Sequence, residues 1–385
     1  AGANPAQVPA SGAQLDALVE VDAAGTVVWE WCFFDHLVQD LDPAKANHVG
    51  AGKTIASHPG RLNINLAGHP LKGDWLHLNS VDYHPALDQL VFNSVQGECY
   101  VIDHGGTFVA GDSAASVAKA ATSAGDFLYR FGDPARYGQG TTPAVLADWT
   151  QSTAGTKQMG GAHGVTWIEP GLPGAGHLMI FSNAQYLSEH TPQSYVLEVD
   201  PFLNTQGTST GRYVNPPEAG YTTLTFPAVM DKTPRSISRQ VTWQYFSRSN
   251  LTLFSNIGCN GQRLPNGNTL ICADTYGYVM EVTPEGETVW DYIMPVTPKG
   301  AVLTLGDNLP MVNSIFRACR YTATHPALVG RPLLPGKTIA GRTTVANPYA
   351  GTTSYQARQR PTGLQYLDAA RAQPGYTLFA AGGTT

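Results

Sequence analysis

Residues 261–292 contain two β-hairpins in succession, Gly261-Gln-Arg-Leu-Pro-Asn-Gly-Asn-Thr-Leu-Ile271 and Met280-Glu-Val-Thr-Pro-Glu-Gly-Glu-Thr-Val-Trp-Asp-Tyr292. In each of them a glycine-containing turn separates two short runs of apolar and β-branched residues, which is the pattern of a hairpin. Two hairpins in a row predict a four-stranded antiparallel meander. This stretch therefore indicates an all-β fold.

The same pair of phrases recurs along the chain. We expect complete four-stranded units near residues 77–132, 163–245 and 253–295, and partial units at 15–32 and after 313. A four-stranded unit repeated at roughly blade-sized intervals is typical of a β-propeller. A large β-sandwich has similar strands and turns and is the alternative.

We predict a single β-propeller domain over residues 1–336, followed by a Gly/Thr/Ala-rich arm or closing segment over 337–385. Four inserts contain few periodic apolar residues and are expected to be long loops, where binding sites often lie. These inserts are Asp35–Asp74, Ala110–Ala124, Gly138–Gly160 and Leu203–Pro234.

Composition narrows the class of protein. Charged residues make up 14% of the chain, against roughly 25% in an average soluble domain, while Gly (41) and Pro (27) are abundant. The net charge of −6 without a Lys/Arg cluster argues against binding to nucleic acid, and the lack of a long apolar run argues against membrane insertion. The chain starts at Ala1 without an initiator Met, which suits a secreted or periplasmic protein after removal of its signal peptide and equally suits a proteolytic product.

The five cysteines are too few for a disulfide scaffold and do not have zinc-ligand spacing. Cys259 and Cys272 flank the turn at residues 265–267 almost symmetrically. In a hairpin they could face each other closely enough to form a disulfide, and the alternative is that both are buried free thiols.

Several blocks of sequence occur in a characteristic order between residues 15 and 325. They are Trp29-Glu-Trp-Cys-Phe-Phe-Asp-His-Leu-Val-Gln-Asp40, Gly73-Asp-Trp-Leu-His-Leu-Asn-Ser-Val-Asp-Tyr83, Gly125-Asp-Phe-Leu-Tyr-Arg-Phe-Gly-Asp-Pro134, Ala162-His-Gly-Val-Thr-Trp-Ile-Glu-Pro-Gly-Leu-Pro-Gly-Ala-Gly-His177, Gly261–Ile271 and Phe316-Arg-Ala-Cys-Arg-Tyr321. Together they resemble the conserved core of the bacterial arylsulfotransferase family of β-propellers.

The resemblance implies a periplasmic or secreted protein that moves a sulfuryl group from a phenolic sulfate to a phenol through a histidine. Neither a nucleotide donor nor another cofactor is implied. An imidazole suits this chemistry because it can attack sulfur and later act as a leaving group. The fold implied is a propeller of six blades, or of fewer blades, or one completed by a partner chain.

Residue by residue, the resemblance places His163 at the position of the transiently sulfurylated histidine. It places His77 and Asn79, from the His-x-Asn phrase, at a second site histidine and its neighbouring Asn. We expect His77 to be the acid/base or a stabiliser of the oxygen atoms, and Asn79 to be a binding group. The alternation of Trp75, His77 and Asn79 predicts one strand face. His36 is a candidate third channel histidine.

Two departures from the family pattern concern the site. The usual His-Asp phrase reads His163-Gly164, and the stretch Phe92–Glu98 lacks the family's arginine. A sulfuryl clamp would have to come from Arg263 or Arg317. Three histidines could instead bind a metal, but no local spacing supports this, so we expect no metal.

The family's upstream stretch with a further histidine is not in this sequence, so we expect a site histidine and perhaps a blade to be missing. An incomplete ring would leave sheet edges that the tail, a partner chain or a second copy could cover. The competing function is therefore a non-catalytic extracellular structural protein that self-assembles into homo-oligomers or filaments.

Overall fold

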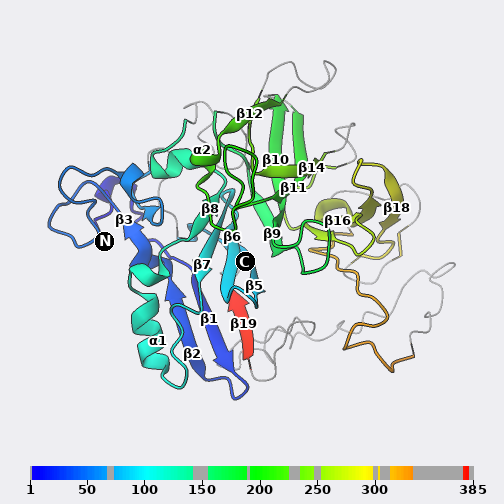
Figure 1. Ribbon diagram of the computed structural model, residues 1–385, viewed down its shortest axis with the longest axis horizontal. Coiled ribbons are helices and arrows are strands. Elements are labelled where there is room, and N and C mark those ends of the chain that lie inside the picture. Colours follow the sequence, from blue (N-terminus) through cyan, green and yellow to red (C-terminus); the bar gives the residue numbers. More distant parts are fainter. Residues whose placement is uncertain are drawn as a thin grey trace.

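The computed structural model describes residues 2–66, 73–141, 155–188, 191–224, 235–246, 253–297, 302–303, 313–332 and 376–380. The described chain is mostly β-structure, with short helices in the connections (Figure 1). None of the helices in these ranges is long and apolar enough to span a membrane.

Three four-stranded antiparallel sheets follow one another along the chain. The first is made of β5 (Leu78–His84), β6 (Gln89–Ser94), β7 (Glu98–Asp103) and β8 (Tyr129–Phe131). The second is made of β9 (Ala162–Trp167), β10 (Leu178–Ser188), β11 (Thr191–Val199) and β14 (Val241–Tyr245). The third is made of β15 (Asn260–Arg263), β16 (Thr269–Ala273), β17 (Tyr278–Val282) and β18 (Thr288–Ile293). The three predicted meanders and the all-β class are confirmed.

The partial unit at the start of the chain is a hairpin of β1 (Ala17–Asp22) and β2 (Val27–Cys32). A third strand, β19 (Tyr376–Ala380), pairs with β1 in antiparallel register from Leu18↔Ala380 to Asp22↔Tyr376 (Figure 1). Residues 376–380 thus contribute a strand to the N-terminal sheet of β1 and β2. Within residues 313–332, where a further partial unit was predicted, the structure has no strand.

Smaller elements lie in the connections. The strands are β3 (Leu37–Val38) paired in parallel with β4 (Leu62–Asn63), and β12 (Tyr221–Leu224) paired with β13 (Arg235–Ser238). The helices are α1 (Ser113–Ala120), α2 (Pro216–Ala219) and 3-10 turns at Pro5–Gln7, Phe33–His36, Ile55–Ser57, Ser123–Gly125, Pro134–Tyr137 and Asp274–Tyr276.

The prediction of a loop at residues 110–124 was wrong, because α1 lies there. Its sequence is rich in alanine, the best helix former. The Asp112 side chain accepts a hydrogen bond from the Ala115 N–H (2.9 Å) and caps the helix. Four alanines and one N-cap are enough to form two turns of helix, so the lack of periodic apolar residues did not indicate a loop.

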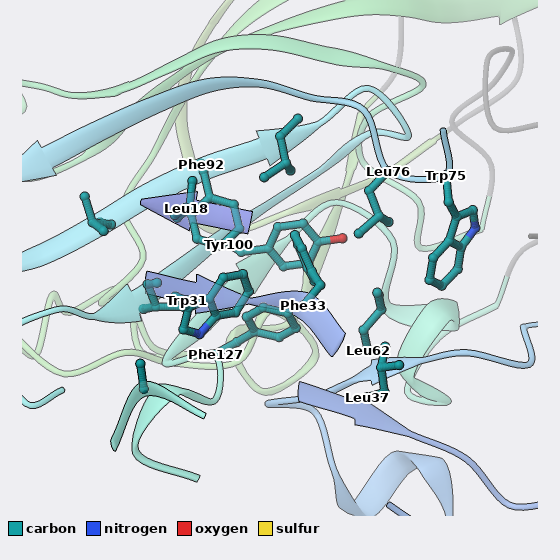
Figure 2. Close-up of a cluster of buried hydrophobic side chains, with 14 of the residues drawn as sticks. Leu18, Trp31, Phe33, Leu37, Leu62, Trp75, Leu76, Phe92, Tyr100 and Phe127 are labelled. Atoms are coloured by element: carbon teal, nitrogen blue, oxygen red, sulfur yellow. The ribbon is translucent and has the colours of Figure 1, made fainter. Parts of the chain in front are cut away.

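A separate hydrophobic core fills the space between each sheet and the next. Figure 2 shows the first core, where Trp31 and Phe33 from the N-terminal hairpin pack against Phe92, Tyr100 and Phe127 of the β5–β8 region. The ring centroids of Phe33 and Tyr100 are 5.5 Å apart in a T-shaped arrangement. Two further buried clusters join the first four-stranded sheet to the second and the second to the third.

Polar side chains join the first strands of successive sheets. The backbone N–H groups of Val165 and Trp167 in β9 donate to Ser80 Oγ (2.9 Å) and Asp82 Oδ2 (2.8 Å) of β5. The carbonyl of Ala162 accepts from Asn93 Nδ2 at 2.7 Å. The edge of β9 that faces away from β10 is therefore satisfied by side chains instead of by a paired strand.

The same arrangement joins β15 to residues 316–320. The Asn260 amide exchanges two hydrogen bonds of 2.9 Å with the backbone of Ala318, and Gln262 does the same with Arg320 (2.7 and 3.0 Å). The Phe316 carbonyl accepts a hydrogen bond from the Cys259 N–H at 2.7 Å. Side-chain amides thus hold a non-strand segment at the place a neighbouring strand would take.

The predicted disulfide between Cys259 and Cys272 is not formed, and both cysteines are free thiols. The register of the hairpin pairs Cys272 with Asn260, so that Cys259 lies one residue beyond the paired position. Cys259 also has a positive φ of 86° and its Sγ accepts a hydrogen bond from the Asp274 N–H (3.2 Å). The almost symmetric spacing about the turn was off by one residue.

His104 connects the N-terminal hairpin to the first four-stranded sheet. Its Nε2 lies 2.8 Å from Glu20 Oε2 on β1, and its Nδ1 lies 2.6 Å from Asp88 Oδ1. Both ring nitrogens face acceptors, so the imidazolium is the form that satisfies them. Burial lowers the pKa of His104, but the hydrogen bonds to Glu20 and Asp88 outweigh it and the pKa is raised.

His104 should make the stability depend on pH. A histidine with a raised pKa contributes stability that is complete below its ordinary pKa of about 6.5 and is lost as pH rises through the folded-state pKa. We expect His104→Gln to lower the free energy of unfolding by about 1.5–3 kcal/mol at about pH 5.5, and by less at about pH 9. Urea unfolding of both proteins at the two pH values, with His48→Gln as control, tests this. A difference that grows with pH would contradict it.

Candidate functional site

His163 is the second residue of β9, and its side chain is 5% exposed. Its Nδ1 lies 2.6 Å from Asn183 Oδ1. The Asn183 Nδ2 donates to the carbonyls of Ser255 (3.0 Å) and Gly258 (3.1 Å), which fixes the orientation of the amide. Asn183 therefore presents an acceptor, so the imidazole must carry its proton on Nδ1 and its lone pair on Nε2. Nε2 has no hydrogen-bond partner among the described residues.

The environment keeps His163 neutral. Burial lowers its pKa to about 4, the hydrogen bond to Asn183 opposes this, and the nearby His77 lowers it slightly further. A buried neutral imidazole with a fixed Nδ1–H and an open Nε2 is suited to attack an electrophile.

The structure explains why glycine follows His163. Gly164 has φ +62°, and a Cβ atom there would lie 2.6 Å from the Cys259 carbonyl oxygen and 2.7 Å from the Cβ of Asn260. Any larger side chain would push β9 away from the third sheet. The carboxylate of a His-Asp phrase cannot fit here, and Asn183 takes over the orientation of the ring.

His77 lies near His163, just before β5. Its Nδ1 is 2.5 Å from Asp74 Oδ2, and both side chains are about half exposed. The predicted alternation of Trp75, His77 and Asn79 along one strand face is wrong, because β5 begins only at Leu78 and His77 has φ +49°. A non-glycine residue in the left-handed region is uncommon and often marks a functional site.

Asp16 adds a second carboxylate beside this pair. Residues 14–16 run next to residues 73–78, as shown by the hydrogen bond from Gln14 N to the Gly73 carbonyl (2.8 Å). Burial and the neighbouring Asp74 raise the pKa of Asp16 to about 6, although a hydrogen bond from the Leu78 N–H and the nearby His77 oppose this. A partly buried carboxyl group that titrates near neutral pH is typical of functional sites.

Asn79 is close to His163, and both ends of its side-chain amide are already hydrogen-bonded within the protein. Its Nδ2 donates to the Ala162 carbonyl (2.8 Å), and its Oδ1 accepts from Asn93 Nδ2 (2.9 Å). Because Ala162 directly precedes His163, Asn79 positions the backbone of the histidine.

The structure does not bring His36 or Arg263 to this site. His36 is buried, stacks on Trp31 and places its Nδ1 2.8 Å from Asp126 Oδ1. It directly precedes β3, a strand that lies well away from β9 (Figure 1). The Arg263 guanidinium pairs with Glu198, donates to the Gly267 carbonyl (3.0 Å) and covers the ring of Trp243. Its charge is already compensated in a contact between the second and third sheets.

Phe316 reaches the site region, and Arg317 is the next residue in the chain. The ring of Phe316 lies 6.0 Å from that of His163, at an interplanar angle of 76°. Arg317 is exposed and makes no hydrogen bond or ion pair with the described residues. It is the predicted clamp residue that remains available to an anion.

Four residues of the site were missed from the sequence: Asp16, Asp74, Asn183 and Phe316. Asp74 and Phe316 lie inside the quoted blocks, and Asp74 could have been found from its i, i+3 spacing to His77. Asn183 lies within β10 and carries no local signal. In the described ranges no group of three or more His, Cys, Asp or Glu side chains is arranged to hold a metal.

A comparison with family models supports the resemblance to the arylsulfotransferase family. The family model described as Arylsulfotransferase (ASST) matches residues 10–200, which include His77, Asn79 and His163. No curated protein matches the chain. Among solved structures, a protein of unknown function from Bacteroides caccae is 10% identical over 77% of this chain and 71% of that chain, with a TM-score of 0.29.

The neutral state of His163 can be observed directly. We expect its imidazole to stay neutral from about pH 8 down to about pH 5, where an ordinary histidine is protonated, because burial lowers its pKa. Histidine NMR titration, with the signal assigned through His163→Ala, measures this. A midpoint above pH 6 would contradict it.

Asp16 should lower stability at neutral pH. An acid with a raised folded-state pKa loses stability as pH rises from its ordinary pKa of about 4 through the folded value of about 6. Asp16→Asn keeps an acceptor for the Leu78 N–H but removes the charge, so we expect a higher melting temperature than wild type at about pH 7.5 and no gain near pH 4. Thermal unfolding at both pH values tests this, and an equal or lower melting temperature at pH 7.5 would show that Asp16 is not destabilising.

Proposed function

We propose that the protein transfers a sulfuryl group from a phenolic sulfate to a phenol through His163, because residues 10–200 match the Arylsulfotransferase (ASST) family model. The observation that carries the proposal is the fixed, neutral imidazole of His163, with Nδ1–H bound to Asn183. No cofactor takes part in the proposed reaction.

In the first half-reaction the Nε2 lone pair of His163 attacks sulfur, and the bond from sulfur to the aryl oxygen breaks. The imidazole becomes a cationic N-sulfuryl adduct, whose Nδ1–H still donates to Asn183 Oδ1 (2.6 Å in the free protein). In the second half-reaction a phenol oxygen attacks the same sulfur, the bond to Nε2 breaks and His163 returns to its neutral form.

His77 is the proposed acid/base. Its Nδ1 is held by Asp74 at 2.5 Å, which leaves Nε2 to give a proton to the departing aryl oxygen and to take one from the acceptor phenol. Asp74 would orient the ring and stabilise its protonated form, as carboxylates do beside catalytic histidines.

Arg317 is the proposed partner of the sulfuryl oxygens. It is exposed, makes no ion pair among the described residues and directly follows Phe316, which contacts His163. Arg263 is a poor candidate because Glu198 already neutralises it. A guanidinium near the sulfuryl group would stabilise the charge on its oxygens in the transition state.

We also infer the complete fold and the location of the protein. The successive four-stranded sheets, each packed on the next through its own core, support a propeller of six or fewer blades. The match to the family model supports a secreted or periplasmic location.

The decisive experiment measures transfer of the sulfuryl group from 4-nitrophenyl sulfate to phenol. We expect the wild type to release nitrophenol and form phenyl sulfate, and to carry a sulfurylated histidine in a peptide that contains His163. His163→Ala should lose both the activity and the adduct, and His48→Ala should keep both. Folded wild-type protein without turnover or adduct would refute the proposal.

The role of His77 as an acid can be tested by comparing donors with different leaving groups. A poor leaving group such as phenolate needs protonation more than nitrophenolate does, so His77→Ala should slow transfer from phenyl sulfate by about 10²–10⁴-fold and transfer from 4-nitrophenyl sulfate by clearly less. Equal losses with both donors would remove His77 from the acid role.

The alternative of a non-catalytic, self-assembling protein has one observation in its favour. The outer strand β18 is exposed along its length, and Val289, Trp290, Tyr292 and Ile293 are between 41% and 55% exposed. Such an edge can pair with another chain. Sedimentation velocity over a range of concentrations would reveal assembly, and Val289→Lys should then abolish it.

A further inference from the structure

We propose that Phe316 is the aryl-binding surface beside His163, and that it makes the site select aromatic over alkyl sulfuryl compounds. The inference rests on the proposed function for the identity of the sulfuryl group, but the selectivity itself is a property of binding. It assigns a role to a residue outside the part of the chain that the family model matches.

The position of Phe316 next to the nucleophile is the first argument. Its ring centroid is 6.0 Å from that of His163 in a T-shaped arrangement, which is the range of direct aromatic contact. A sulfur atom poised for attack lies about 3–3.5 Å from the attacking atom. The aryl group is joined to this sulfur through one oxygen, so its ring would lie within reach of the Phe316 ring.

The second argument is that Phe316 combines exposure with a fixed backbone. Its side chain is 54% exposed, although it touches a histidine that is only 5% exposed. The carbonyl of Phe316 is held by Cys259 N at 2.7 Å, and the two hydrogen bonds between Ala318 and Asn260 (2.9 Å each) follow. An apolar ring held in one place and left open to solvent needs little ordering when it binds a second ring.

The chemistry of the neighbouring residues fits an aromatic anion. Arg317 supplies a positive charge without a partner among the described residues, and Phe316 supplies an apolar face directly before it. A ligand with an aromatic ring and a negatively charged sulfuryl group matches both features, whereas an alkyl ligand matches only the charge.

Binding of two unreactive probes tests the inference without turnover. Benzenesulfonate and methanesulfonate carry the same anionic group but have no oxygen that can leave, and calorimetry measures their affinities. We expect the wild type to bind benzenesulfonate more tightly. Phe316→Ala should weaken benzenesulfonate binding by about tenfold and leave methanesulfonate binding unchanged. Phe316→Trp, which keeps a ring, should retain the preference.

Phe34 offers a matched control, since it is a phenylalanine of similar exposure (59%) on the 3-10 turn Phe33–His36. Phe34→Ala should change neither affinity. Equal weakening of both probes in Phe316→Ala would assign Phe316 a merely structural role, and no aryl preference in the wild type would overturn the inference.

The outcome is distinguishable from failure of the proposed function. If the wild type prefers benzenesulfonate through Phe316 but shows neither turnover nor a histidine adduct, sulfuryl transfer is refuted and selective binding stands. If transfer occurs and Phe316→Ala keeps the wild-type preference for aryl over alkyl sulfonates, transfer stands and the role of Phe316 is refuted.

Discussion

The structure depends on hydrogen bonds between neighbouring sheets, in which side chains of one sheet pair with the backbone groups at the buried edge of the next. β9 is paired with β10 on one side only, and its other edge lies buried against β5. Unpaired backbone groups in such a place would cost about 1–3 kcal/mol each. Ser80 and Asp82 of β5 accept their hydrogen bonds, and the side-chain amides of Asn260 and Gln262 repeat the solution in the third sheet. Sheets whose first strands run side by side can therefore pack face to face without sharing a ladder.

The candidate site uses the same kind of contact. Asn183 belongs to β10, but its amide reaches the backbone carbonyls of Ser255 and Gly258 ahead of the third sheet, and only then can its oxygen hold His163. Gly164 permits the two sheets to approach closely enough for this. The departure from the family's His-Asp phrase is thus a different way to orient the ring, in which a neutral amide replaces a carboxylate and leaves the imidazole uncharged.

Local patterns predicted the parts of the fold that local chemistry determines. Turns such as Pro265–Gly267 located the four-stranded sheets and the His-x-Asn phrase located His77 near His163, but contacts between distant residues were out of reach. Arg263 reads as a free cation until Glu198, 65 residues away, is placed against it. Likewise, His77 has a positive φ and so does not continue the strand that the alternation of residues predicted. Asn183 can orient His163 only because residues 255–258 fix its amide, and these residues are far away in the sequence. The period of apolar residues also could not reveal the short alanine-rich helix α1 or the one-residue shift in the register of the β15–β16 hairpin.

The pairing of β19 with β1 has a consequence for the order of folding. Leu18 leaves the ribosome long before Ala380 does, yet the two residues face each other in one sheet. Contacts of such high sequence separation form slowly, because a very long loop must close first. The three central meanders can each form from contiguous residues, whereas one edge of β1 stays unpaired until β19 has been synthesised. The sheet that contains β1 can therefore be completed only after the three central meanders have been synthesised, and the open edge of β1 is exposed in the meantime to pairing with the wrong strand.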